Sequence, residues 1–384
     1  RKFYNGIVTP IDGIVQQSQW SILMKDEALE RGSVTLKFNE NLQYVRAIAA
    51  LSVMLYHAAH YVHIQLGPGL YDGFHHFLGL YGVEIFFALS GYLMMELSQK
   101  QSAYRFLVAR IVRIYPALLI ATIIAIILDP FRIIPKFDWR SITLVPSKFI
   151  FYSLNVEWSL VHEMFFYIVI STFIFSSFQR FLPVVGILWI IVIIHYSATP
   201  LPRIGRADIS QILIMQANAG FAAGLLIPFI SRLFARWSAF FLVIFVAAIP
   251  VSYFGPAYYA RIIAGIGSAF LVAAAVQRTR PVLVGKPATV MKNLGDWSYA
   301  MYLIHVPVVL VVLRILPSGL NKLVVYILCV IMAFVFSIGL GVIDLKIHSF
   351  LRNKVRHMQD DILKNRMAVF VAGYFFLSLV LLAL

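Results

Sequence analysis

An arginine and a histidine, Arg46 and His57, stand eleven residues apart inside the first long apolar stretch of the chain, Asn41 to Val62. Eleven residues span about three turns of an α-helix, roughly 16 Å along its axis, and the two side chains point the same way to within about 20°. An arginine at mid-depth in a bilayer costs about 2.5–3.5 kcal/mol, so both groups should face a polar interior rather than lipid. The pair is a candidate chemical site; the alternatives are snorkelling of Arg46 and an interhelical hydrogen bond of His57.

Carboxylates lie in two further apolar stretches. Glu84 stands in the second, which continues to Ser90 and Gly91, small residues typical of close helix packing. Glu163 stands in the fourth, beside His162. A carboxylate in hydrocarbon should be paired or protonated, so these residues predict a proton relay, a substrate-orienting group or a structural ion pair.

Paired side chains recur at helical spacing elsewhere. Arg110 and Arg113 are three residues apart in a predicted inner loop, and two guanidinium groups on one face could hold a phosphate. The alternative is ordinary positive-inside charge. Tyr302 and His305 are likewise three apart, two residues before Pro307, which predicts an opening in that helix toward a cavity.

The composition is that of a polytopic membrane protein. Hydrophobic residues make up 61% of the chain and charged residues 13%, about half the share in soluble domains. The net charge of +15 does not indicate nucleic-acid binding, because the basic residues are scattered at the ends of apolar runs. The single cysteine, Cys329, lies in an apolar run, and no Cys/His spacing predicts a metal site.

Eleven stretches are long enough to be candidate membrane spans and predict an all-α bundle of about 10–11 helices. They are residues 42–62, 78–97, 114–130, 151–175, 181–197, 209–230, 238–254, 260–277, 297–316, 321–343 and 367–384. Lys and Arg concentrate on the side of the N-terminus, which we therefore place in the cytoplasm. The predicted parts are a cytoplasmic tail (1–41) with a short helix near Lys25–Arg31, a core (42–345), a basic linker (346–366) and an extra hydrophobic helix (367–384).

The order and spacing of these features resemble the membrane acyltransferase-3 family over roughly residues 38–345. The matching pieces are Arg46-Ala-Ile-Ala49 with His57; Gly82-Val-Glu84-Ile-Phe-Phe with Ser90-Gly91-Tyr92-Leu93; Arg110-Ile-Val-Arg113 with Tyr115-Pro116; Trp158-Ser159-Leu160 with Glu163, Phe166 and Tyr167; and Ser298-Tyr299 with Tyr302-Leu303, His305 and Pro307.

The resemblance implies an O-acetyltransferase of the bacterial inner membrane that uses acetyl-CoA as donor and no metal. The acceptor would be a hydroxyl of a cell-surface or exported polysaccharide or of its lipid-linked precursor. Arg46 and His57 fall on the family's essential arginine and histidine, and Arg110 and Arg113 on its paired-arginine motif. The family core has ten spans, so that 367–384 is an addition.

Acyl transfer to a hydroxyl needs a base for the alcohol proton and a polarising group for the developing oxyanion. We expect His57 to be the base or, alternatively, to carry the acyl group transiently. Arg110, Arg113 and Arg46 would hold CoA, whose extended pantetheine arm matches the distance from Arg46 to His57.

The remaining site residues are assigned around a buried cavity. Glu163, Tyr302 and His305 are expected to line it and to position the sugar or orient His57, and Glu84 and Trp158 complete the predicted substrate-binding set. Two rival functions stay open: a proton-coupled transporter or flippase for lipid-linked sugars, and an acyltransferase acting on a small metabolite.

Overall fold

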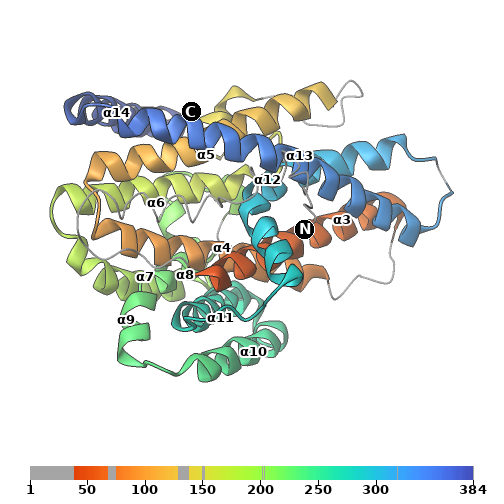
Figure 1. Ribbon diagram of the computed structural model, residues 1–384, viewed down its shortest axis with the longest axis horizontal. Helices are drawn as coiled ribbons and strands as arrows, with labels where there is room; N and C mark the ends of the chain where they lie inside the picture. The colour runs from red at the N-terminus through yellow and green to blue at the C-terminus, as the bar shows by residue number, and fades with distance from the viewer. Residues whose placement is uncertain are drawn as a thin grey trace, which may run out of the picture.

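The computed structural model describes residues 39–67, 75–128, 138–148, 152–200, 202, 204–317 and 319–383. These residues form helices and no strand, which confirms the predicted all-α bundle (Figure 1). Nine of the described helices are long and apolar enough to cross a membrane, counting the 3-10 turn η2 (Gln179–Phe181) with α7. They are α3 (Glu40–Leu66), α4 (His75–Ser98), α5 (Ala103–Leu128), α6 (Glu157–Phe175), α7 (Leu182–Tyr196), α11 (Ala257–Gln277), α12 (Lys286–Ile315), α13 (Lys322–Arg356) and α14 (Asp360–Ala383).

Two predicted spans differ from the rest. The prediction of one span over 209–230 is wrong, because this segment breaks into η4 (Ile212–Ile214), α8 (Asn218–Gly224) and α9 (Ile227–Leu233). Pro228 at the start of α9 supplies no backbone N–H, so it begins a helix rather than continuing one. The other, α10 (Ser238–Phe254), is a single apolar helix of 17 residues.

Two connections predicted to lie outside the spans are largely helical. The paired arginines belong to the first half of α5 rather than to a loop, since this helix already begins at Ala103. The basic stretch 346–366 continues α13 as far as Arg356, and α14 begins at Asp360. The tail helix predicted near Lys25–Arg31 lies outside the described residues.

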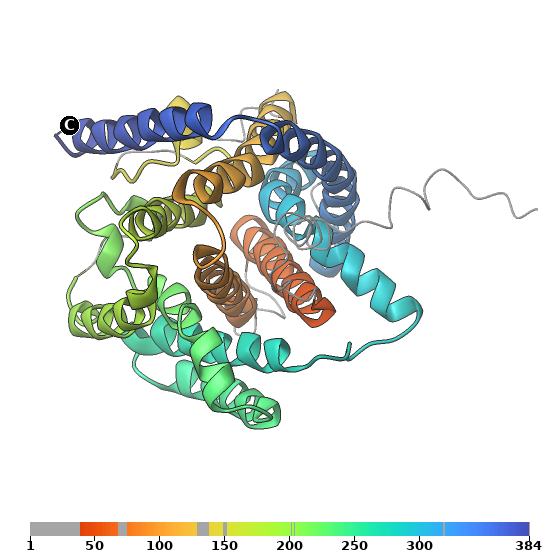
Figure 2. The same cartoon turned by 60° about the vertical axis from the view of Figure 1, so that its left-hand side comes forward.

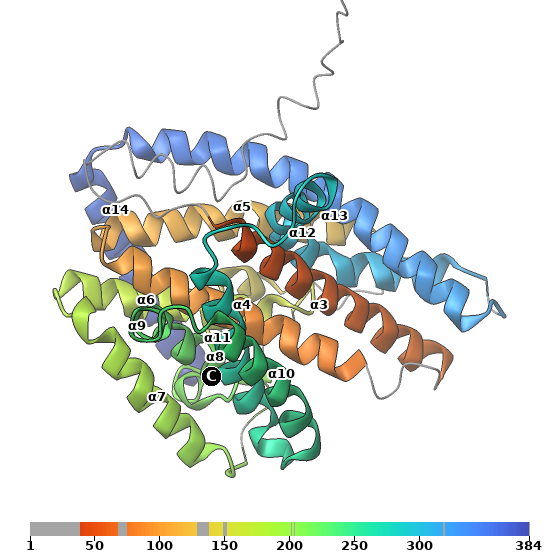
Figure 3. The same cartoon turned by 60° about the horizontal axis from the view of Figure 1, so that its bottom comes forward.

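Helices α3 and α4 occupy the middle of the bundle, and the other helices surround them (Figure 2). Helix α13 runs along one edge and α7 along the opposite one (Figure 3). Several of the buried side chains of α3 are small: Ala47, Ala49 and Ala58 are fully buried. Small residues let helix backbones approach closely where there is no water to drive association.

The two ends of the bundle are named here after the residues at the ends of α3. At the Asn39 end, the Asn39 amide caps the start of α3 and also donates to the Ala275 carbonyl at the end of α11, at 2.9 Å. At the Leu66 end, the ring of Tyr253 near the end of α10 lies 4.9 Å from that of Phe77 in the first turn of α4. The direction of α11 follows: it begins at the Leu66 end.

The first turn of α6 is held by its own first residue. Asn155 adopts a left-handed conformation with φ of 61°, which turns the chain into the helix. The buried Glu157 carboxylate then accepts hydrogen bonds from the backbone N–H groups of Leu154, at 2.8 Å, and Val156, at 3.1 Å. The position of every residue at the start of α6 is thereby fixed relative to the loop before it.

Helices α4 and α8 cross with their backbones in contact. A Cβ built on Gly91 would come within 2.2 Å of the Phe221 carbonyl oxygen, and one built on Gly224 within 2.4 Å of the Ala88 carbonyl oxygen. No side chain fits there, so glycine is required by the approach of the two backbones. Gly91 is therefore a packing residue, one of the alternatives predicted from the sequence.

Substitution Gly91→Ala should separate α4 from α8 and destabilise the bundle by about 1–3 kcal/mol, the usual range for overpacking. The measurement is thermal unfolding of the purified protein in detergent. Gly339→Ala is the matched control, because a Cβ at this helical position meets nothing within 4 Å. The control should unfold at or slightly above the wild-type temperature, since alanine favours the helix. Equal melting temperatures for Gly91→Ala and wild type would show that the crossing tolerates a side chain.

Candidate active site

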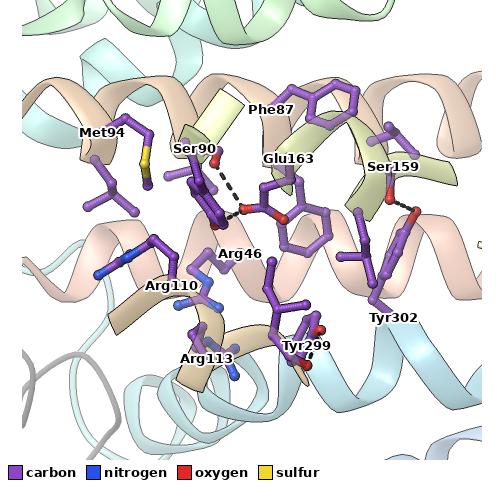
Figure 4. A pocket seen from close by; sticks show the side chains of 17 residues that line it. Arg46, Phe87, Ser90, Met94, Arg110, Arg113, Ser159, Glu163, Tyr299 and Tyr302 are labelled. Carbon is purple, nitrogen blue, oxygen red and sulfur yellow. Dashed lines mark hydrogen bonds between the residues drawn. The ribbon is translucent and has the colours of Figure 1, made fainter. Parts of the chain in front are cut away.

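A partly open cavity of about 110 Å³ lies between α3, α4, α5, α6 and α12. It is several times larger than one water molecule needs but smaller than the 300–1,000 Å³ of a pocket that encloses a whole small molecule. A chain of a few atoms fits, and a nucleotide does not. Its polar lining consists of Arg46, Ser90, Arg110, Arg113, Ser159, Glu163, Tyr167, Tyr299 and Tyr302 (Figure 4).

Three arginines gather at one end of this cavity (Figure 4). Arg46 comes from α3, and Arg110 and Arg113 come from α5. Arg46 and Arg110 are buried, with 7% and 4% of their surface exposed. Against these three positive charges, the described lining offers one carboxylate, Glu163. Two more carboxylates lie close to the cluster: Asp344 pairs with Arg113, and Asp296 interacts electrostatically with Arg46. The site therefore favours an anionic ligand chiefly at Arg110, whose Nε has no acceptor among the described residues.

The two arginines of α5 differ in their partners. Arg113 donates to the buried Asp344 carboxylate of α13 at 3.0 Å, and its guanidinium group lies 4.4 Å from the centre of the Tyr299 ring. Arg110 lies 5.9 Å from the centre of the Phe106 ring, and nothing in the described part of the chain accepts a hydrogen bond from its Nε. A buried donor without an acceptor is costly, so Arg110 is well suited to bind a ligand's anionic oxygen.

Glu163 faces the cavity and is held there by two hydroxyl groups. Its Oε1 accepts hydrogen bonds from Ser90, at 3.0 Å, and from Tyr167. His162 does not join it, because consecutive helical residues point about 100° apart. The His162 ring instead contacts the Asn218 side chain of α8 at 2.8 Å. Glu163 and His162, neighbours in the sequence, thus have different partners, and of the roles predicted for Glu163 its place in the cavity lining suits the orienting of a substrate.

A serine and a tyrosine close the other end of the cavity. The hydroxyl groups of Ser159 and Tyr302 lie 2.6 Å apart (Figure 4). Tyr302 also donates to the Val156 carbonyl, at 3.2 Å, just before α6 begins. Tyr302 thereby ties α12 to the fixed first turn of α6.

His57 and His305 form a contact pair beyond Tyr302. Nδ1 of His57 lies 2.8 Å from Nε2 of His305, and Nδ1 of His305 lies 2.9 Å from the Met301 carbonyl oxygen. A carbonyl only accepts, so Nδ1 of His305 carries a proton. When both rings are neutral, Nε2 of His305 is then the acceptor and Nδ1 of His57 the donor. Nε2 of His57 is left with a free lone pair, which is what a general base requires.

Neither histidine is among the described residues that line the cavity. The expectation that His305 lines it is therefore wrong: His305 is fully buried behind Tyr302, and the two rings are 6.2 Å apart. Its place against His57 agrees with the alternative expectation that it orients His57. His57 itself is half-buried and lies on the same continuous helix as Arg46.

Glu84 and Trp158 also lie outside the described cavity lining. Glu84 is fully buried and accepts a hydrogen bond from Arg261 of α11 at 2.9 Å. The same guanidinium group lies 5.8 Å from the centre of the Trp158 ring. The structure brings Arg46, Arg110, Arg113, Glu163 and Tyr302 to one cavity and places the predicted substrate residues Glu84 and Trp158 around Arg261 instead.

Sequence reasoning missed Asp344 and Arg261, the charge partners of Arg113 and Glu84. Asp344 directly follows the predicted span 321–343 and Arg261 is the second residue of the predicted span 260–277, and a charged residue at the edge of a span is usually ascribed to the membrane interface. The structure instead places Asp344 well inside α13. The one available signal was the charged residues inside the predicted spans, since each buried charge needs a partner of opposite sign.

The described residues contain no group of three or more His, Cys, Asp or Glu side chains placed to hold a metal ion. The groups available for chemistry are the three arginines at one end of the cavity and, beyond its other end, His57 with its unprotonated Nε2. This arrangement suits an anionic substrate whose reactive end extends away from its charged end.

The family model of an acyltransferase domain, that of the acyltransferase-3 family, matches residues 39–342, most of the chain. Comparisons with curated proteins and with solved structures found no match. The matched range includes every residue of the cavity and both histidines. The chain therefore belongs to the acyltransferase-3 family and is a multi-pass membrane acyltransferase.

Proposed function

We propose that this membrane acyltransferase moves an acetyl group from acetyl-CoA to a hydroxyl of a cell-surface or exported polysaccharide or of its lipid-linked precursor. The observation that carries the proposal is the set of three arginines around one narrow cavity. CoA is a polyanion at one end and a thioester at the other. The proposed place of action is the bacterial inner membrane, with the Asn39 end of the bundle in the cytoplasm, where CoA is found.

The donor binds with its phosphates at the arginine end. Arg110 has a free donor, Arg113 adds charge from the next turn of the same helix, and Arg46 adds charge from α3. The nucleotide is too large for 110 Å³ and stays at the Asn39 end, while the pantetheine arm enters the cavity. Arg46 and His57 are separated by roughly 16 Å of helix, a distance that this arm spans.

The acceptor hydroxyl gives its proton to Nε2 of His57 as its oxygen attacks the acetyl carbonyl carbon. The C–S bond then breaks, and the proton returns to the CoA thiolate. His305 acts as a positioning residue, because its bond to Met301 sets the tautomer of His57. Tyr302 lines the cavity and its ring lies 6.2 Å from that of His305, so the acetyl group passes Tyr302 on its way to the histidines. A transient acyl group on His57 is the alternative route.

Substitution Arg110→Gln should raise the KM for acetyl-CoA about 10–100-fold, the usual worth of one or two hydrogen bonds to a charged group. Arg105→Gln is the matched control: Arg105 lies on the same helix but pairs with the exposed Asp360 at 2.5 Å. Acetyl-CoA binding to purified protein measures both. Unchanged binding of acetyl-CoA by Arg110→Gln would show that its phosphates do not bind at the arginine end.

Asp344→Asn should act in opposite directions on stability and on donor affinity. The Arg113 charge is left buried without its carboxylate, which destabilises the fold by about 3–5 kcal/mol. The phosphates of acetyl-CoA can replace that carboxylate, so the ligand should raise the melting temperature of this variant more than that of wild type. Glu96→Gln is the control, since the Glu96–Lys100 pair is partly exposed and worth about 0.3–0.5 kcal/mol. An equal or smaller ligand-induced shift would place the phosphates away from Arg113.

His57→Ala should lower the rate of acetyl transfer about 10²–10⁴-fold while acetyl-CoA still binds, because the variant removes the base and not the arginines. The assay is transfer from labelled acetyl-CoA in purified protein or membrane vesicles. His195→Ala, an exposed position on α7, is the control and should react as wild type does. Acetyl transfer or acetyl-CoA hydrolysis at the wild-type rate in His57→Ala would exclude the proposed base.

A further inference from the structure

A second cavity, of about 450 Å³, lies at the opposite end of the bundle from the arginines. Its polar lining is Ser197 and Thr199, just after α7 ends, Gln216, before α8, and Tyr258 and Arg261 in the first turns of α11. Helix α11 begins at the Leu66 end, because its last turn is held by Asn39. This outer cavity therefore faces the side away from the proposed CoA entry.

The outer cavity is polar without a strong net charge. Arg261 is the one charged residue of its described lining, and that charge is balanced by the buried Glu84 carboxylate at 2.9 Å. The other groups are two hydroxyls, an amide and a phenol, which both donate and accept hydrogen bonds. Tyr258 has 44% of its surface exposed, so its ring is available to a ligand. These groups can form more hydrogen bonds with a neutral, hydroxyl-rich ligand than with an anion.

The outer cavity is connected to the reaction site through the first turn of α6. Arg261 lines the outer cavity and lies over the Trp158 ring, at 5.8 Å. The next residue, Ser159, lines the inner cavity and contacts Tyr302 at 2.6 Å. Two adjacent residues of one helical turn thus belong to the walls of the two cavities.

We propose that the outer cavity, lined by Thr199, Gln216, Tyr258 and Arg261, binds a neutral sugar ring of the acyl acceptor. The inference rests on the proposed acetyltransferase function and names the acceptor's binding place and chemical class. A volume of 450 Å³ lies within the range of pockets that enclose small ligands, whereas the inner cavity is too narrow for a ring and a thioester together. Arg261, through Glu84 and Trp158, positions the acceptor relative to α6.

The test compares one filling and one truncating variant. Thr199→Trp fills the cavity, and Tyr258→Ala removes an exposed ring without touching the core. The assay uses membrane vesicles from a strain that lacks the chromosomal gene, supplied with radiolabelled acetyl-CoA, and counts alkali-labile acetate on the endogenous envelope glycans. Acetyl-CoA binding to the purified variants is measured in parallel. Tyr253→Ala is the matched control, a tyrosine at the same end with 55% exposure that does not line the cavity.

We expect Thr199→Trp to reduce transfer to the background of the deletion strain, Tyr258→Ala to slow it about threefold to tenfold, and Tyr253→Ala to leave it unchanged. Acetyl-CoA binding should stay within twofold of wild type in all three. Wild-type transfer by Thr199→Trp overturns the proposal, and so does loss of acetyl-CoA binding, which would assign the cavity to the donor. Loss of a co-purifying phospholipid from Thr199→Trp, with transfer intact, assigns it to a lipid headgroup and also overturns it. Failure of the proposed function looks different: wild type itself then binds no acetyl-CoA.

Discussion

The burial of several guanidinium charges in the middle of an apolar bundle is the constraint around which this structure is organised. Charge in a low-dielectric interior is tolerated only with partners or with a ligand that supplies them. Asp344 from α13 meets Arg113, and Glu84 from α4 meets Arg261. Each pair links helices that are distant in sequence, so the placing of charges also decides which helices are neighbours. Arg110 differs from these two arginines, because its Nε has no acceptor among the described residues.

The positions of Arg46, His57 and His305 depend on continuous helices rather than on loops. Helix α3 carries Arg46 and His57 at a fixed separation, and one turn of α12 carries both Met301 and His305. The Met301 carbonyl sets the tautomer of His305, and His305 in turn sets that of His57. A backbone group thus controls which nitrogen of His57 is basic. This control needs no further charged residue inside the membrane.

Much of the fold, and part of the candidate site, could be predicted from the sequence. Nine of the eleven predicted spans are long helices, because runs of about 20 apolar residues have few other stable forms in lipid. The convergence of Arg46, Glu163 and Tyr302 on one cavity was also within reach, since polar groups in spans must face inward. Arg110 and Arg113 were expected in a loop, and they reach the cavity because α5 begins earlier than the predicted span. The sequence did not predict the breaks around α8 or the different partners of Glu163 and His162. Both depend on which face of a nearly all-apolar helix meets which neighbour, and uniform hydrophobicity carries no such signal.

The start of α6 has a role that its sequence does not reveal. Trp158 and Ser159 point about 100° apart, toward Arg261 and toward Tyr302, so this single turn separates the two cavities. Glu157 fixes the turn by binding the backbone N–H groups before it. The two cavities are thereby walled off from each other by one rigid helical turn. Tyr302 belongs to this wall as well: its hydroxyl contacts Ser159 and the Val156 carbonyl, and its buried ring lies 5.9 Å from that of Phe86 on α4. The tyrosine therefore couples the position of α12 to both α6 and α4, so that a shift of one of these helices is felt by the other two.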